Sequence, residues 1–401
     1  MSRPAIIELP EYRTVSRPAG ALPEAAGERL SSHYSLQVAI TPPTFLNSYQ
    51  WQLVNQGWVG HIPLMPDVQI ALTPKVAIEN LFRMLEYAYR LKSFSLLEGT
   101  IQSDRLADLY ESLAAVLAKR VLDRGRKGYY RAYIAENDEL PYVRGQIDLT
   151  QALVKPWAVT LSCHFQEHIA DIEDNQILTW TLFRIARGGV CSERVLPTVR
   201  RAYRSLQSLT VLTPVEAQTC VARHYHRLND DYRPLHALAR FFLEHSGPSH
   251  QLGERTMIPF LVNMARLYEL FVAEWLRLNL PQHLKLRTQH KVTLDEASGL
   301  HFATNLLIEE AAIRRVLYVL DTKYKAPEST PSTSDVSQII AYAQNQGAPE
   351  GILIYPVDLP QPLTMSSRGI RIRSLTFGLA GDLEKAGQAF VANLTPSSDM
   401  L

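Results

Sequence analysis

Apolar and polar residues alternate through residues 34–74, and this period of two predicts a β-rich first part of the chain. Leu36, Val38 and Ile40 would share one face of a strand, and residues 68–72 have the composition of another short strand. The spacing then changes to three and four residues, which is typical of helices with one apolar face. It predicts helices over residues 78–90, 106–122, 176–187 and 259–279, with Asp174 and Asn175 capping the third.

The C-terminal third of the chain combines both periods. Its pattern predicts two strands, a helix and a third strand, over residues 302–308, 315–324, 336–346 and 351–355. Ser334 and Asp335 are suitable N-caps for that helix, and the last strand is a continuous apolar run of the kind found in buried parallel strands. With the long helix before them, these elements predict an α/β core built on a mixed sheet.

The composition is that of an ordinary globular protein. The chain has 401 residues, of which 46% are hydrophobic and 20% charged, and this length allows two or three domains. We expect an N-terminal domain over residues 1–145, a mostly helical connecting region over 146–250 and a C-terminal domain over 251–401. The net charge of +1 gives no global signal for nucleic acid, so binding of DNA would depend on local patches.

Three scattered cysteines without a CxxC pair favour a reducing cytoplasm. We expect no membrane association, because no apolar run reaches eighteen residues and the N-terminus lacks an apolar signal core.

The most informative chemistry lies where the second C-terminal strand ends. Asp321 and Lys323 are two residues apart, so in a strand their side chains would project from one face. A carboxylate that can hold a divalent metal beside an ammonium that can polarise a water is the minimal apparatus for metal-assisted phosphodiester hydrolysis. Gln338 and Tyr342 would share one face of the following helix, which can lie beside this strand end.

These motifs, in this order, resemble the PD-(D/E)xK nuclease superfamily and, more closely, the McrC subunit of McrBC-type modification-dependent restriction systems. The matching segments are residues 321–325 (DTKYK), 335–338 (DVSQ), 341–342 (AY) and 353–356 (LIYP), with weaker matches at 74–76, 80–82, 141–145, 174–178 and 264–271. The resemblance implies a restriction-endonuclease-like C-terminal domain and an α+β N-terminal domain that docks on a hexameric McrB-like AAA+ GTPase.

The resemblance also implies Mg²⁺-dependent cleavage of double-stranded DNA, stimulation of the partner's GTP hydrolysis, and recognition of methylated cytosine by the partner. The chain has no P-loop sequence of its own. Asp321 and the Thr322 carbonyl would hold the metal, and Lys323 would orient or deprotonate the attacking water or offset charge on phosphorus. Gln338 and Tyr342 would support the site, and Glu269, on the helix before the strands, is a further acid.

Asn305 occupies the position of the family's first acid. An amide can coordinate a metal through one neutral oxygen but brings no charge. Three interpretations remain open: a residue deliberately changed to block cleavage, a natural variant that cleaves weakly or not at all, or a different register in which Glu309 or Glu310 is the acid. Because Asp321 and Lys323 are retained, we favour the first interpretation, then the second.

A basic segment rich in tyrosine contains Arg124, Arg126 and Lys127. With Lys325 these residues are candidates for contact with DNA phosphates, although a solvated helix end running into a strand explains the segment better. Two alternatives to a nuclease subunit also remain: a non-catalytic activator that serves as a DNA-binding scaffold, and a repair nuclease that acts with another motor.

Overall fold

A computed structural model describes residues 5–65, 68–89, 106–189, 191–221, 223–247, 250–252, 255–257, 259–295, 300–325 and 330–394. The chain divides into two compact units, one made of residues 1–106 and 261–401 and the other of residues 107–260. The second unit is therefore an insertion into the first. These boundaries differ from the expected division at residues 145 and 250, because the chain returns to its first sheet after the insertion.

The N-terminal part of the first unit is β-rich, as predicted. Its strands are β1 (Ala5–Pro10), β2 (Thr14–Pro18), β3 (Val38–Thr41), β4 (Gln50–Asn55), β5 (Trp58–Met65) and β6 (Val68–Thr73), and its helices are α1 (Glu24–His33) and α2 (Ile78–Ala88). They form sheets of order β2-β4-β3 and β1-β6-β5-β12, where β12 (Leu261–Asn263) comes from beyond the insertion. One apolar cluster that includes Trp51, Ile70 and Leu261 fills the space between these elements.

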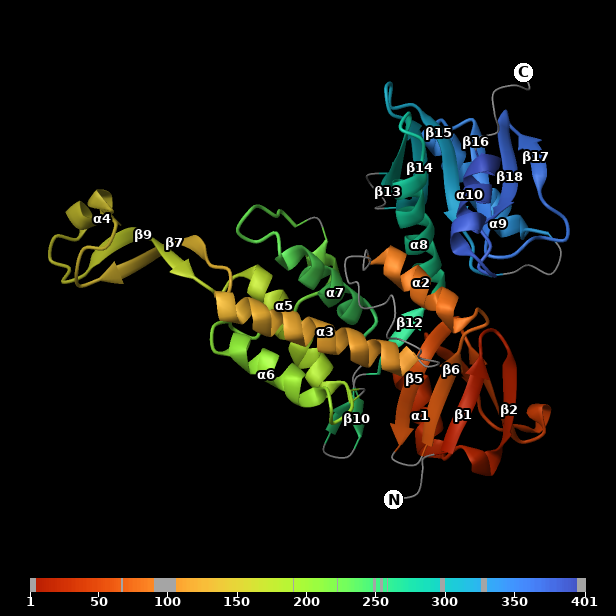
Figure 1. Ribbon diagram of the computed structural model, residues 1–401, viewed down its shortest axis with the longest axis horizontal. Coiled ribbons are helices and arrows are strands. Elements are labelled where there is room, and N and C mark those ends of the chain that lie inside the picture. Colours follow the sequence, from red (N-terminus) through yellow and green to blue (C-terminus); the bar gives the residue numbers. More distant parts are fainter. Residues whose placement is uncertain are drawn as a thin grey trace. The chain divides into compact units, whose positions relative to one another are not determined.

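The C-terminal part of the first unit is a mixed six-stranded sheet flanked by helices (Figure 1). Its elements are α8 (Met264–Asn279), β13 (Leu284–Asp295), β14 (Leu300–Glu310), β15 (Val316–Thr322), α9 (Thr333–Gln346), β16 (Glu350–Tyr355), β17 (Thr364–Ser367), β18 (Ile370–Thr376) and α10 (Leu383–Leu394). The strand order is β13-β14-β15-β16-β18-β17, in which β15, β16 and β18 are parallel to one another. The predicted mixed sheet and the predicted buried parallel strand β16 are confirmed.

Helix α9 covers one face of this sheet. Val319, Leu353 and Ile372 belong to the same apolar cluster as Ile339 and Tyr342 of α9. Because side chains alternate along a strand, Asp321 shares the face of Val319, which is the face that α9 covers.

Two helix starts and one strand in the C-terminal part differ from the predictions. Helix α8 begins at Met264 rather than Pro259, because the apolar residues before it form β12, and Asn263 caps the helix by accepting a hydrogen bond from the Arg266 amide. Helix α9 is capped by Ser332, not by Ser334 or Asp335. Strand β13 was not predicted, although it pairs with β14 along most of its length.

The second unit consists of helices and a long β-ribbon. Its elements are α3 (Leu106–Lys127), β7 (Ala132–Leu140), β8 (Gln146–Ile147), α4 (Leu149–Val154), β9 (Leu161–Ile169), α5 (Glu173–Arg187), α6 (Leu196–Gln207), α7 (Tyr232–Glu244), β10 (His250–Leu252) and β11 (Arg255–Met257). The β7–β9 ribbon extends from the helices and ends at α4 (Figure 1). The predicted cap of α5 is wrong, because the helix already begins at Glu173 and includes Asp174 and Asn175.

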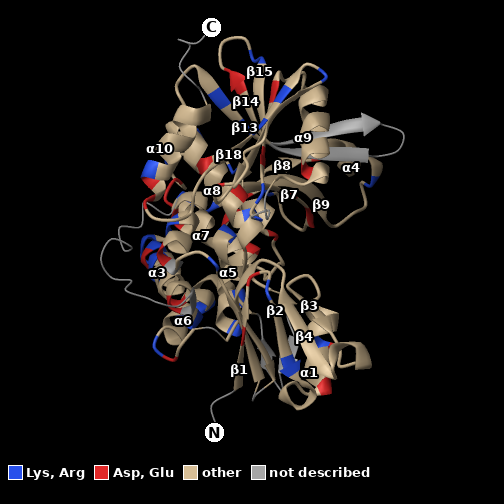
Figure 2. Ribbon diagram, turned by 90° about the vertical axis from the view of Figure 1, so that its right-hand side faces the viewer, with Lys and Arg blue, Asp and Glu red and all other residues tan. Residues whose placement is uncertain are grey.

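Basic and acidic residues are interspersed along the chain, in agreement with its net charge (Figure 2). Within the described residues, no helix combines the length and apolar character that crossing a membrane requires.

Candidate metal-assisted hydrolytic site

The carboxyl end of β15 carries Asp321 and Lys323 into one small cluster. Asp321 pairs in register with Leu353 of the parallel strand β16, and the Lys323 amide donates a hydrogen bond to the Ile354 carbonyl at 2.8 Å. The backbone on both sides of Thr322 is therefore held against a buried strand. Asp321 is only 2% exposed and the Lys323 side chain is largely buried beside it, whereas the Lys325 side chain reaches the surface.

Lys323 bridges two carboxylates. Its Nζ lies 2.9 Å from Oδ2 of Asp321 and 3.2 Å from Oδ1 of Asp335, which belongs to the first turn of α9. Lys325 Nζ lies 2.9 Å from the other oxygen of Asp335. The prediction that Asp321 and Lys323 project side by side is confirmed, and the structure adds a second acid to the pair.

Two side chains on one face of α9, Gln338 and Tyr342, extend the hydrogen-bond network that begins at Lys323. Lys323 Nζ donates to Oε1 of Gln338 at 2.9 Å, and Nε2 of Gln338 donates to the Tyr342 hydroxyl at 2.7 Å. Gln338 is thus oriented from both ends, since its acceptor and its donor are each engaged. The predicted juxtaposition of this helix face with the end of β15 is confirmed.

Asp335 is the residue of this site that the sequence analysis missed. It was expected as a helix cap, but the cap is Ser332, which accepts from the Asp335 amide at 3.2 Å and donates to Oδ2 of Asp335 at 2.7 Å. Asp335 precedes Gln338 by three residues and Tyr342 by seven, a spacing that places all three on one helical face. That periodicity was the available signal.

The charges at this strand end shift one another's pKa. Burial raises the pKa of the Asp321 carboxyl, Lys323 opposes that shift, and the negative charges of Asp335 and Glu269 reinforce it. Burial acts to raise the pKa of Asp335 too, but hydrogen bonds from Ser332, Lys325 and Lys323 together hold it below its usual value. Burial disfavours the charged form of Lys323, and yet Asp321 and Asp335 raise its pKa above the ordinary lysine value.

Glu269 lies close enough to influence Asp321 electrostatically, but its ion pair is with another residue. Oε2 of Glu269 lies 2.9 Å from the guanidinium of Arg266, one turn earlier on α8. The structure therefore places Glu269 at the margin of the cluster.

Asn305 lies on β14, the strand next to β15. Leu306, which follows it, pairs with Leu320, which precedes Asp321, so the backbones of Asn305 and Asp321 lie next to the last pair where β14 and β15 separate, in the middle of β14 and near the end of β15. The side chain of Asn305 lies outside the described residues.

The register excludes the interpretation in which Glu309 or Glu310 takes the place of Asn305. Glu309 pairs with Val316, five residues before Asp321, which corresponds to about 17 Å along a strand. Glu309 forms an ion pair with Arg287, and Glu310 with Arg315. Neither acid can reach the end of β15 that carries Asp321.

The residues predicted to contact DNA phosphates have different surroundings. Lys325 pairs with Asp335 in the candidate site. Arg124 turns toward α7, where it lies 3.4 Å from Asp231, whereas Arg126 pairs with Asp123 on the surface. Lys127 is the exposed last residue of α3. The favoured interpretation of this segment, the end of a helix that leads into a strand, is confirmed for the backbone, because α3 ends at Lys127 and β7 begins at Ala132.

Comparison with known proteins identifies the class to which the chain belongs. Residues 53–356 match the family described as McrBC 5-methylcytosine restriction system component, so the chain belongs to this family. This match confirms the resemblance inferred from the motifs and argues against the alternative of a repair nuclease.

Among solved structures, the chain is similar in fold to one from a refined half-complex of a tetradecameric assembly of Thermococcus gammatolerans McrB AAA+ hexamers with bound McrC. That match has a TM-score of 0.54 and 17% sequence identity, and it covers 98% of this chain and 100% of the other. A second match, to the cryo-EM structure of the Thermococcus gammatolerans McrBC complex, has a TM-score of 0.43 and 18% identity over 71% of this chain and 90% of the other. No curated protein matches the chain.

Proposed function

We propose that this chain is the DNA-cleaving subunit of an NTP-dependent restriction complex and that the end of β15 is its Mg²⁺-dependent nuclease site. The observation that carries the proposal is the continuous set of contacts from buried Asp321 through Lys323 to Asp335, Gln338 and Tyr342. An isolated surface ion pair does not need a buried carboxylate or a helix face built around it. The arrangement of β14, β15, β16 and α9 supports a restriction-endonuclease-like fold for this part of the chain.

The residues at this strand end fit a divalent cation. Burial raises the pKa of the Asp321 carboxyl even though Lys323 lies beside it, so a further positive charge there would stabilise the ionised carboxylate. Within the described residues, no three His, Cys, Asp or Glu side chains gather as a metal site built from protein alone would need. Mg²⁺ commonly uses one or two carboxylates together with waters and substrate phosphate, so Asp321, the Thr322 carbonyl and Asn305 would be sufficient holders.

A bound Mg²⁺ would supply Lewis-acid activation of the scissile phosphodiester and of water. The protein's own part is carried by Lys323, whose ammonium is held between Asp321 and Asp335 and faces Gln338. From there it would orient the attacking water and offset the charge that develops on the phosphoryl oxygens. Asp335 and Gln338 would fix the position of Lys323, and Tyr342 would fix that of Gln338.

Asn305 makes this nuclease weak or silent. An amide at residue 305 could offer a cation one neutral oxygen but no charge, so affinity for Mg²⁺ and the acidity of bound water would both be lower than with a carboxylate. Asp321, Lys323 and Gln338 match the family pattern, so residue 305 is the position where it is broken. A carboxylate at residue 305 would complete the group of residues expected of an active nuclease.

The partner would be a McrB-like AAA+ GTPase hexamer, since the structural relative comes from an assembly of McrB AAA+ hexamers with bound McrC. A surface suited to this contact lies at the tip of the second unit. Five apolar side chains in and just after α4 are between 66% and 91% exposed, namely Leu149, Leu153, Val154, Trp157 and Val159. Helix α4 stands at the end of the β7–β9 ribbon (Figure 1), and several strongly exposed apolar residues in one short segment indicate a protein-binding surface. They lie just beyond residues 1–145, where docking was expected.

The deciding experiment compares this chain with Asn305→Asp in cleavage of methylated duplex DNA, with Mg²⁺, the cognate NTPase and GTP. GTP hydrolysis is followed in the same samples. We expect Asn305→Asp to cut faster than the parent chain, both to stimulate hydrolysis equally, and Asp321→Asn in the Asn305→Asp background to abolish cutting. If Asn305→Asp fails to cut while it stimulates the partner fully, the nuclease assignment is wrong.

One alternative has an observation in its favour. The uncharged Asn305 is compatible with an activator that binds DNA and stimulates the NTPase without cutting. In that case, neither the chain nor Asn305→Asp would cleave, and Asp321→Asn would leave GTP hydrolysis and DNA binding unchanged.

A further inference from the structure

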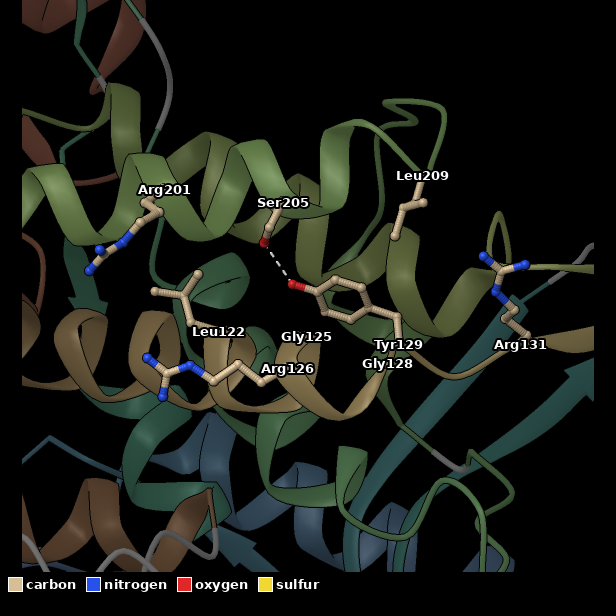
Figure 3. Close-up of a pocket in the computed structure, with 9 residues that line it drawn as sticks. All are labelled: Leu122, Gly125, Arg126, Gly128, Tyr129, Arg131, Arg201, Ser205 and Leu209. Atoms are coloured by element: carbon tan, nitrogen blue, oxygen red, sulfur yellow. Dashed lines mark hydrogen bonds between the residues drawn. The ribbon is translucent and has the colours of Figure 1, made fainter.

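A pocket of about 540 Å³ opens in the second unit between the end of α3, the segment that leads into β7, and α6 (Figure 3). It is lined by Leu122, Gly125, Arg126, Gly128, Tyr129, Arg131, Arg201, Ser205 and Leu209. No acidic residue is among them. The pocket lies entirely within residues 107–260 and is separate from the candidate nuclease site.

The wall of the pocket is fixed by one tyrosine. The Tyr129 hydroxyl lies 2.6 Å from the Ser205 hydroxyl on α6, and burial raises the pKa of Tyr129, so the phenol stays neutral. The ring folds back over α3 at Gly125, where a Cβ atom would approach the Tyr129 hydroxyl to 2.7 Å. Gly125 therefore permits the ring position that joins the two helices, and the pocket does not need a ligand to form.

Three arginines from three different segments surround this wall. Arg126 and Arg201 lie on the Leu122 side of the Tyr129 ring, and Arg131 lies on its other side (Figure 3). Arg126 also pairs with Asp123 at 2.8 Å, but its side chain remains 81% exposed. Helix α6 carries three arginines and no acid in the sequence LPTVRRAYRSLQ, so the field along this helix is positive.

We propose that this pocket binds the sugar–phosphate backbone of DNA. Guanidinium groups present planar, paired donors that match phosphate oxygens. The three guanidinium groups lie at the two ends of a less polar wall formed by Tyr129, Leu122 and Leu209. This arrangement suits a ligand that has anionic groups on either side of a less polar part. Successive phosphates joined by a deoxyribose have this form, whereas a single phosphate would engage one end only.

Family membership favours DNA over an acidic peptide as the occupant, because DNA is the polyanion on which a 5-methylcytosine restriction system acts. The pocket would add a DNA contact outside the nuclease site. It would also give the arginines of the predicted basic segment two different roles. Arg126 would face DNA with Arg131 and Arg201, whereas Arg124 is committed to Asp231.

The test measures binding of the full chain to fluorescently labelled single-stranded and duplex DNA by anisotropy, without divalent metal, over a series of salt concentrations. Arg126→Ala, Arg131→Ala and Arg201→Ala are compared with Arg200→Ala. Arg200 is a matched control, because it is an exposed arginine adjacent to Arg201 on α6 that does not line the pocket. Circular dichroism verifies that each variant is folded.

We expect each pocket variant to bind several-fold more weakly and to lower the slope of log K against log salt by about one, while Arg200→Ala changes neither. Equal losses for Arg200→Ala and Arg201→Ala would overturn the pocket in favour of diffuse surface charge. Unchanged binding in all three pocket variants would overturn it as well.

Two further arms identify the ligand. Unlabelled DNA, polyglutamate and GTP are each added as competitors of labelled DNA. Unlabelled DNA should displace the labelled DNA at a far lower concentration than polyglutamate or GTP does. Displacement by polyglutamate at equal charge concentration would overturn the assignment to DNA and indicate an acidic protein partner, and displacement by GTP at similar concentration would indicate a nucleotide. In the unsubstituted chain, DNA should protect Arg126, Arg131 and Arg201 from phenylglyoxal while leaving Arg200 reactive.

Discussion

Asp335 holds two lysines of the candidate site at once, and its substitution gives the clearest prediction at the scale of a residue. Asp335→Asn keeps an oxygen for Ser332 but removes the charge that anchors Lys323 and Lys325. We expect DNA cleavage in the Asn305→Asp background to decrease roughly tenfold or more, the usual cost of losing a residue that orients a catalytic group. Initial rates of cleavage at saturating Mg²⁺ measure the effect.

The control for Asp335→Asn is Ser332→Ala. This substitution removes the N-cap of α9 and should cost about 1 kcal/mol of stability, measured by urea unfolding. It leaves the carboxylate of Asp335 in place, so cleavage per folded molecule should change little. If Ser332→Ala and Asp335→Asn reduce cleavage equally, Asp335 acts by holding the helix and not by positioning Lys323.

His236 provides a prediction of pH dependence. Its Nδ1 accepts from the Tyr225 hydroxyl at 2.9 Å and its Nε2 donates to the Asp174 carbonyl at 3.0 Å, so both nitrogens of the neutral ring have hydrogen-bond partners. Burial lowers the pKa of His236 from 6.5 to about 4. Between pH 6.5 and about 4, His236 is protonated in the unfolded chain but neutral in the folded chain. The stability present above pH 6.5 is therefore lost as the pH falls toward 4.

Between pH 6.5 and about pH 5 the loss from His236 amounts to about 2 kcal/mol of the free energy of unfolding. Urea unfolding at several pH values measures it, and His236→Gln should flatten this part of the profile even though it lowers stability at neutral pH. An equally steep profile in His236→Gln would assign the acid sensitivity to other groups.

The sequence predicted those site residues that are linked by local geometry. Asp321 and Lys323 are two apart on a strand, and Gln338 and Tyr342 are four apart on a helix, so each pair is fixed by one period. Asp335 was taken for a helix cap because its partner, Lys323, follows a different element, and the ion pair of Arg124 with Asp231 could not be seen in the sequence for the same reason. Sequence spacing carries no information about which distant element approaches.

At the scale of elements, the packing of α10 on α8 depends on a single glycine. A Cβ atom at Gly387 would overlap the ring of Trp275, which is 1% exposed. Replacing an exposed helical glycine by alanine usually stabilises a protein, but here we expect Gly387→Ala to destabilise it by about 1–3 kcal/mol because the core is overpacked. Gly378→Ala, whose Cβ would have no neighbour within 4 Å, is the control and should change stability little. Urea unfolding followed by tryptophan fluorescence measures both variants, and a stabilised Gly387→Ala would contradict the packing.

The starts of α8 and α5 show why element boundaries were harder to predict than element types. Leu261 and Val262 fit the apolar face of a helix equally well, and they become strand β12 because β5 offers them an edge to pair with. Asp174 is of a residue type that often caps helices, but it lies within α5, where its Oδ2 is 3.0 Å from the guanidinium of Arg223. In both cases a tertiary partner prevailed over local preference.

At the scale of the whole molecule, the chain interrupts one compact unit with another. Leu261 pairs with Gly60, so residues on either side of the 107–260 insertion belong to one sheet. A linear division of the sequence cannot reveal such a closure, because the paired strands β5 and β12 lie on opposite sides of the insertion in the sequence. The proposed division of functions follows these units: the first contains the candidate nuclease site, and the second contains the apolar tip and the arginine pocket.

This division predicts that stimulation of the partner and cleavage chemistry can be separated by substitution. Trp157 is 79% exposed at the apolar tip, and a large aromatic side chain that becomes buried in an interface commonly contributes 2 kcal/mol or more. We expect Trp157→Ser to weaken binding to the McrB-like hexamer by roughly thirtyfold, which corresponds to that energy, and to require correspondingly more protein for stimulation of GTP hydrolysis.

Val211→Ser is the control for Trp157→Ser, because Val211 is also an exposed apolar residue of the second unit, 64% exposed, that lies outside the tip. It should leave stimulation unchanged. DNA binding without the partner should be the same in both variants, since neither residue lines the arginine pocket or the site at Asp321. Normal stimulation by Trp157→Ser combined with Leu153→Ser would move the docking surface away from α4, and residues 1–89 of the first unit would then be the place to look for it.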